Sequence, residues 1–141
     1  MTRRFALPRL YNVRLCAACI LLAASCSAQQ DTPLDDTRWV VSDIAGTPVP
    51  VGRARLSIGF GGQLAADAGC GRIDTVAEIG AGRISIAAPS PPLRRCPATA
   101  AQRDSAVRAA LSLAATFRQG TTTLTLFDAA GAPVMRLRAP G

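Results

Sequence analysis

The chain has 141 residues, with nine acidic side chains, 16 basic side chains that are all arginine, and a net charge of +7. It contains no histidine, which excludes a Ser-His-Asp triad, a Cys-His pair and any metal site with histidine ligands. The length allows one domain with a single core, and the arginines are too dispersed and the aromatic residues too few for a nucleic-acid-binding surface, so we expect no nucleic-acid partner.

The first residues have the order of a secretory signal peptide. Four arginines within the first 14 residues are followed by an apolar run at residues 15–24 and by small residues at 25–28. This order is typical of exported proteins. The apolar run is shorter than the about 20 residues that a membrane-spanning helix requires, so we expect residues 1–25 to be removed. The remaining chain has 12 arginines and nine acidic residues, a net charge of +3.

The end of this signal resembles a lipobox, the sequence that marks a bacterial cysteine for lipid attachment. Residues 22–26 read Leu-Ala-Ala-Ser-Cys, with Ala23 where lipoboxes favour leucine. We expect Cys26 to be lipidated and to become the first residue of the exported protein. The alternative is ordinary signal cleavage after Ala28, which follows small residues at the positions that signal peptidase reads. The residue after the lipidated cysteine is Ser27 and not an aspartate. By the usual sorting pattern of lipoproteins, this favours attachment to the outer membrane over the inner one.

A short tether precedes the folded domain. Residues 26–33 are mostly polar and are expected to form a flexible tether between lipid and domain. The domain is expected to span residues 34–139. Its first strand is predicted at residues 39–44, which are apolar and end at the turn-forming sequence 45–48.

Short strands are predicted in the middle of the domain. Residues 56–60 alternate between apolar and small or polar side chains, which predicts one buried face. The glycine pair 61–62 predicts a hairpin turn into residues 63–67. Residues 73–76 and 83–86 are weaker strand candidates. The side chains expected on the buried face of the 56–60 strand are Leu56, Ile58 and Phe60.

One helix is predicted after position 98. Thr99 and Gln102 have the spacing of a capping box. Further along, apolar residues recur at helical spacing, while Arg103, Asp104 and Arg108 fall largely on the opposite, solvated side. We expect the apolar stripe to pack on the sheet. Its members are Ala106, Val107, Ala110, Leu111, Leu113 and Ala114.

The clearest hairpin lies near the end of the chain. Leu124 and Leu126 alternate with threonines, and the turn sequence 128–131 follows them. Residues 134–137 then form the second strand of the predicted hairpin.

The order and spacing of several short motifs resemble the META domain (HslJ-like) family, over essentially all of the chain from residue 34 onward. The resemblance implies an α+β fold in which a curved, mostly antiparallel, barrel-like β-sheet packs on a single α-helix. It also implies a bacterial envelope protein of a family linked to heat stress and drug tolerance, without established enzymatic activity. The motifs are Leu-Asp-Asp-Thr-Arg-Trp at 34–39, Gly-Thr-Pro-Val at 46–49, Leu-Ser-Ile-Gly-Phe at 56–60, Gly-Cys-Gly at 69–71, Arg-Cys at 95–96 and Leu-Thr-Leu-Phe-Asp-Ala-Ala-Gly at 124–131.

The sequence departs from the family at one motif. Gly71 stands where the family has asparagine, and residues 73–77 replace the Phe-x-Gly-x-Tyr sequence that follows it. The roles of that asparagine and tyrosine are therefore not carried over to this chain.

The cysteines predict a disulfide. Cys16 and Cys19 leave with the signal peptide, and lipidation would occupy Cys26. Cys70 and Cys96 then remain as the pair in an oxidising compartment, where we expect them to be bonded. The alternative is two separate buried thiols that behave as small apolar side chains.

Catalytic interpretations have less support. Asp67, Asp74 and Glu78 lie among predicted turns and strand ends, where acidic residues are ordinarily solvated. Arg94 and Arg95 beside the predicted helix start could form a small anion site, although a solvated basic turn is the simpler interpretation. We expect no catalytic residues, no metal and no cofactor.

The sequence therefore predicts a non-enzymatic envelope lipoprotein. It would be a monomer in the periplasm, attached to the membrane by its lipid, and would bind an envelope protein or a small molecule. The alternative is a secreted periplasmic domain with weak hydrolase or redox activity that uses Cys70 or the nearby carboxylates.

Overall fold

The computed structural model describes residues 34–141. The predicted signal peptide, the tether and Cys26 lie outside the described residues. No helix in the described part of the chain has the length and apolar character that crossing a membrane requires.

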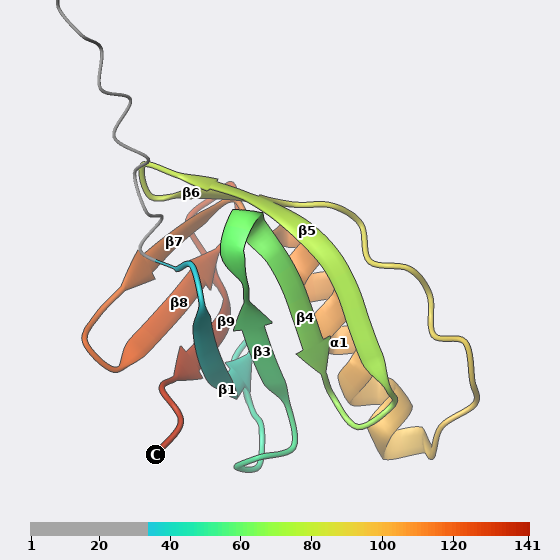
Figure 1. Cartoon of the computed structure of the whole chain (residues 1–141). Coiled ribbons are helices and arrows are strands. Elements are labelled where there is room, and N and C mark those ends of the chain that lie inside the picture. The colour runs from blue at the N-terminus through green and yellow to red at the C-terminus, as the bar shows by residue number, and fades with distance from the viewer. Residues whose placement is uncertain (1–33) are drawn as a thin grey trace, which may run out of the picture.

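The strands form one antiparallel sheet that closes on itself (Figure 1). Its order is β2-β1-β3-β4-β5-β6-β7-β8-β9, and a further pairing of β1 with β9 completes the closure. The short strand β2 pairs only with the end of β1. The strands are β1 (Thr37–Ile44), β2 (Thr47–Pro48), β3 (Arg55–Ile58), β4 (Gln63–Asp67), β5 (Arg72–Gly80), β6 (Arg83–Ile86), β7 (Thr116–Gln119), β8 (Thr123–Phe127) and β9 (Pro133–Arg138).

A 16-residue helix, α1 (Ala98–Leu113), joins β6 to β7 and packs on the closed sheet (Figure 1). Val107 and Leu111 of the helix belong to the same buried cluster as the inward-facing residues of the strands. Strands β6 and β7 share a single pair, Arg83 with Thr116, so the sheet is weakest at this seam. The fold is thus α+β with a barrel-like antiparallel sheet and one helix, which confirms the predicted fold class.

The alternation of apolar and polar residues in the sequence predicted several strands correctly. Leu56 and Ile58 of β3 are buried, as are Leu124 and Leu126 of β8, because every second side chain of a strand faces the core. The predicted hairpins are present, with β3 followed by β4 and β8 followed by β9. The sequence did not predict β7.

Phe60 does not belong to the buried face of β3, contrary to the prediction. It lies in a 3₁₀ turn, η1 (Phe60–Gly62), and 72% of its surface is exposed. Gly61 and Gly62 have positive φ angles, and a β-carbon on Gly62 would overlap the carbonyl oxygen of Ala77. Only glycine fits against Ala77 at position 62. The turn that places Gly62 there begins at Phe60, so Phe60 no longer belongs to the strand.

Two expectations for the helix are also wrong. Pro97 is the N-cap of α1 and no side chain caps the first turn, so Thr99 and Gln102 form no capping box. Asp104 is buried, with 2% of its surface exposed, whereas 58% of Leu113 is exposed. The buried side of the helix is thus rotated toward Asp104.

Candidate functional site

A groove lined by arginines crosses the outer face of β1, β3, β4 and β5. It encloses about 640 Å³, within the range of ligand-binding clefts. Arg38, Arg55 and Arg72 are exposed and line it, together with the exposed Asp67 and the small residues Ser57 and Ala65. We call this surface, formed by these six residues, the arginine groove.

The strand register explains the shape of the groove. Arg38 pairs with Ser57, and Ser57 pairs with Ala65, so the two small side chains follow one another across the sheet. Ser57 also donates its hydroxyl to the carbonyl of Ala65. The next row along the strands holds Arg55 and Arg72 with Asp67 between them, so the small side chains form a low floor beside charged side chains of both signs.

Two of the three arginines form no ion pair within the described part of the chain, although Asp67 lies opposite Arg55 on the neighbouring strand. Arg72 Nε lies 2.6 Å from Asp74 Oδ1, but both side chains are largely exposed, so this pair is weak. None of the ion pairs among residues 34–141 involves Arg38 or Arg55. A guanidinium presents parallel N–H donors that match carboxylate and phosphate groups. The arginine groove is therefore suited to an anionic ligand.

A second groove, between α1 and residues 44–50, has a different character. It encloses about 580 Å³ and is lined mainly by apolar side chains, including those of Val49, Ala106 and Leu113. The one charged residue in its lining, Arg103, donates from Nη1 to the carbonyl of Ala68 at 2.9 Å. This helix groove is suited to an uncharged apolar group and offers few polar contacts for specificity.

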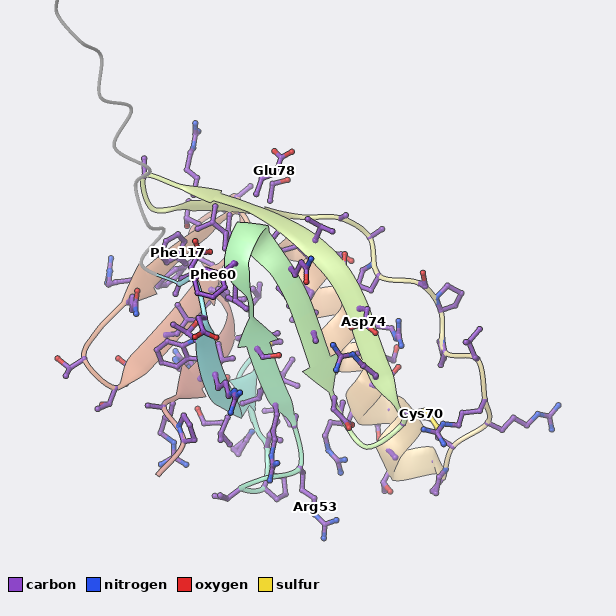
Figure 2. All side chains as sticks on the ribbon, in the orientation of Figure 1. Arg53, Phe60, Cys70, Asp74, Glu78 and Phe117 are labelled. Atoms are coloured by element: carbon purple, nitrogen blue, oxygen red, sulfur yellow. A yellow bond between two sulfur atoms is a disulfide. The ribbon has the colours of Figure 1, made fainter. Side chains whose placement is uncertain are left out.

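Cys70 and Cys96 form a disulfide, the pair that the sequence analysis expected, with Cα atoms 5.5 Å apart. The bond joins the turn between β4 and β5 to the residue that precedes the N-cap of α1 (Figures 1 and 2). Cys70 is buried, with 5% of its surface exposed, whereas Cys96 is partly exposed. Both cysteines line a cavity of about 400 Å³, which we call the disulfide cavity.

The disulfide cavity contains a buried ion pair that sequence reasoning missed. Arg108 Nε lies 2.6 Å from Asp104 Oδ2, and both side chains are largely buried. Arg108 also donates from Nη1 to the carbonyl of Ser90, which ties the loop before α1 to the helix. Asp104 Oδ1 is buried and has no hydrogen-bond partner among residues 34–141. The four-residue spacing is typical of a helical ion pair, but nothing in that spacing indicates burial.

Gly71 gives space to an arginine beside the disulfide. Its φ of +114° is a conformation that side chains rarely adopt, and a β-carbon there would lie 3.1 Å from Arg94 Nη2. Arg94 is therefore packed against the backbone that follows Cys70. The departure from the family asparagine thus makes room for Arg94.

The other predicted candidates do not converge on a site. Asp67 Oδ1 accepts a hydrogen bond from the Gly69 amide, and Asp74 pairs with Arg72. Asp74 and Glu78 lie at separate positions along β5 (Figure 2). Among residues 34–141, no three His, Cys, Asp or Glu side chains gather into a metal-binding group.

The closed sheet with one helix has relatives of known structure and a matching sequence family. The family model described as META domain matches residues 32–141, which confirms the resemblance noted in the sequence. No sequence among the curated proteins matches the chain.

Two solved structures have a similar fold. One, described only as an NMR structure, is 17% identical with a TM-score of 0.59, and the match covers 75% of this chain and 91% of that one. The other is a crystal structure of a DUF4847 family protein from Bacteroides vulgatus, 12% identical with a TM-score of 0.57, and the match covers 75% of this chain and 94% of that one. At these identities the likeness shows the fold alone.

Proposed function

The chain belongs to the META domain family, and from this premise we propose that it is a non-enzymatic binding domain of the bacterial cell envelope. In this proposal a lipid on Cys26 holds the domain to a membrane facing the periplasm. Its arginine groove binds acidic, extended segments of other envelope proteins. The observation that carries the proposal is that Arg38 and Arg55 form no ion pair among residues 34–141 and lie beside a floor of small residues, with three arginines against one aspartate in the lining.

The spacing of the arginines favours an extended chain over a single small anion. Arg38 lies on β1 and Arg72 on β5, three strand spacings apart, which is roughly 14 Å. A single carboxylate or phosphate group would contact all three guanidinium groups only if the flexible side chains converged on it, at a cost in side-chain entropy. In an extended peptide, every second side chain lies about 6.8 Å further along, so acidic residues at alternate positions can meet successive arginines.

The floor of the groove supports the same ligand. Because Ser57 and Ala65 are small, the backbone of a bound segment can approach the sheet closely between the arginines. A flat membrane surface would contact the rim of such a groove and leave its floor empty. The expected affinity is modest and decreases with salt, because exposed ion pairs contribute roughly 0.2 to 1 kcal/mol each and are screened.

Binding of an acidic peptide tests the site. The purified full chain is titrated with a peptide of alternating glutamate and serine. We expect Arg38→Gln with Arg55→Gln to weaken binding about tenfold, since two ion pairs of this size are lost. Arg83→Gln with Arg118→Gln, which removes the same charge from β6 and β7, should leave the affinity unchanged. An equal loss in both double variants would show that net charge alone attracts the peptide and that the groove is not the site.

The anchor has a separate test. Protein purified from membranes of an expressing bacterium is measured by intact mass. The proposal predicts a chain from Cys26 to Gly141 that carries a diacylglyceryl or triacyl group, and a Cys26→Ser variant that is not lipidated. A soluble chain that begins at Gln29 would contradict the anchor without affecting the arginine groove.

A further inference from the structure

An exposed phenylalanine lies at the end of the barrel where the described chain begins. Thr37, the first residue of β1, pairs with Ile58, the last residue of β3. Phe60 follows directly in the turn after β3. Figure 1 shows the start of β1 and this turn at the same end of the sheet. Phe60 is 72% exposed, so it contributes little to the core.

Further uncharged surface adjoins Phe60. Val76, which is 53% exposed, pairs with Gln63, the residue that follows the turn. The turn after β3 (59–62) and the turn after β5 (80–82) contain no charged residue, and both lie at this end because the strands between them are antiparallel. We call Phe60, Val76 and these two turns the apolar end. Exposed apolar surface of this kind is typical of contact with a membrane or a protein.

We propose that the apolar end contacts the membrane to which the domain is attached, with the side chain of Phe60 inserted at the boundary between headgroups and acyl chains. This orientation rests on the proposed lipid on Cys26, which holds the domain at that membrane. The strands then lead away from the membrane. The arginine groove, on their outer face, stays open to proteins of the periplasm.

The length of the tether favours this end of the barrel. The tether, residues 26–33, has eight residues and spans at most about 29 Å when fully extended. It joins the domain at Leu34, just before β1, so the apolar end reaches the membrane without an extended tether. The opposite end is a strand length further away, roughly 27 Å for the eight residues of β1. Contact through that end would require a nearly fully extended tether, at a cost in conformational entropy.

Val51 and Leu93 are also exposed, but they lie toward the opposite end of the barrel. Val51 is in the turn between β2 and β3, and Figure 2 shows Arg53 of the same turn at the other end of the barrel from Phe60. Leu93 lies shortly before Cys96, which the disulfide joins to the turn between β4 and β5. These side chains are therefore far from the point where the tether joins the domain.

Phenylalanine is suited to shallow insertion. Proteins that bind at the surface of a bilayer bury Phe, Trp and Leu side chains at the boundary between headgroups and acyl chains. Asp36 and Arg83, which are exposed near the apolar end, can stay in the hydrated headgroup layer. A single acyl chain already gives only marginal membrane binding, and one aromatic side chain gives less. The contact therefore orients a domain that its lipid already holds at the membrane.

Quenching by brominated lipids tests this contact. The lipidated protein is purified from membranes and reconstituted into phosphatidylcholine vesicles with or without bromine on the acyl chains. Phe60→Trp places a reporter at the apolar end, and Val51→Trp is the matched control at the opposite end. Brominated lipids should remove about half or more of the emission that Phe60→Trp adds, because its indole lies among the lipids. The emission that Val51→Trp adds should stay unchanged, as should that of the buried Trp39.

A second reporter tests the contribution of Phe60 itself. Val76→Trp reports on the same end of the barrel while Phe60 is either kept or replaced. Phe60→Ser should lower the quenching of this reporter about twofold, because the end is no longer inserted. Val51→Ser, which also removes an exposed apolar side chain, should not lower it. Equal quenching with and without Phe60 would overturn its insertion.

The intact mass of each sample separates this proposal from the anchor. A lipidated chain in which Phe60→Trp and Val51→Trp are quenched equally, or in which neither is quenched, would overturn the contact and leave the anchor in place. A chain without lipid would overturn the anchor and, with it, this orientation. A lipidated chain with quenching confined to Phe60→Trp is the result that we expect.

Discussion

The arginine groove and the disulfide cavity use the same residue type in opposite ways. In the groove, Arg38 and Arg55 extend from the sheet into solvent and form no ion pair among residues 34–141. In the cavity, Arg108 is largely buried and bonded to both Asp104 and the carbonyl of Ser90. The exposed arginines are free to bind a ligand and contribute little to the fold. The buried arginine contributes to the fold by pairing with a buried carboxylate.

The largest expected effect is the loss of the buried ion pair. Asp104→Ala leaves Arg108 largely buried without an acidic partner, and should lower the free energy of unfolding by about 4 kcal/mol. The matched control, Asp74→Ala, breaks an exposed pair and should change it by less than about 0.5 kcal/mol. Urea unfolding of both variants measures the difference. Similar values for the two would contradict the distinction between buried and exposed arginines.

The disulfide should have the next largest effect. Its partners are 26 residues apart, so Cys70→Ser with Cys96→Ser should destabilise the domain by about 3 kcal/mol in the chain-entropy model. The loop before α1 should also become more open to protease, because it would lose its covalent link to the turn between β4 and β5. Urea unfolding with limited proteolysis checks both effects. Unchanged stability in the double variant would show that the cavity does not need its covalent link.

Restoring the family residue beside the disulfide should have a smaller effect. Gly71→Asn places a side chain at φ +114° against Arg94, and should cost about 1 to 2 kcal/mol. Gly82 also has a positive φ, but a β-carbon there meets nothing within 4 Å. Gly82→Asn should therefore cost less than about 1 kcal/mol, since asparagine tolerates left-handed backbone. A stabilising effect of Gly71→Asn would contradict the packing of Arg94.

The smallest effect on stability is expected in the arginine groove. Arg38→Gln with Arg55→Gln removes exposed charges without buried contacts, so the free energy of unfolding should change by less than about 0.5 kcal/mol. Thermal unfolding of this variant, compared with its loss of peptide binding, separates function from fold. A large loss of stability would assign these arginines to the fold.

The sequence predicted the parts of the fold that depend on local pattern. Strict alternation located β3 and β8, and turn sequences located the hairpins after them. Phe60 was assigned to the wrong face because the close approach of Gly62 to Ala77 depends on the pairing of β4 with β5, which alternation along a single strand does not indicate. Asp104 was placed in solvent because its burial depends on the loop that the disulfide and Ser90 hold against the helix.

The candidate sites were harder to predict than the fold. The disulfide pair followed from cysteine number and compartment. The arginine groove depends on the register of four strands, which places Arg38, Ser57 and Ala65 in one row. Each of these residues alone is an ordinary surface side chain, so no sequence motif indicated the groove.

The most direct test of the central claim is to locate the bound peptide on the domain. The isotope-labelled full chain is titrated with the alternating glutamate and serine peptide while the backbone amide signals are followed by NMR. We predict that the signals of Arg38, Arg55, Ser57 and Ala65 shift together and that those of the helix groove, including Ala106 and Leu113, stay in place. Shifts confined to the helix groove, or spread evenly over all arginines, would contradict the proposed site.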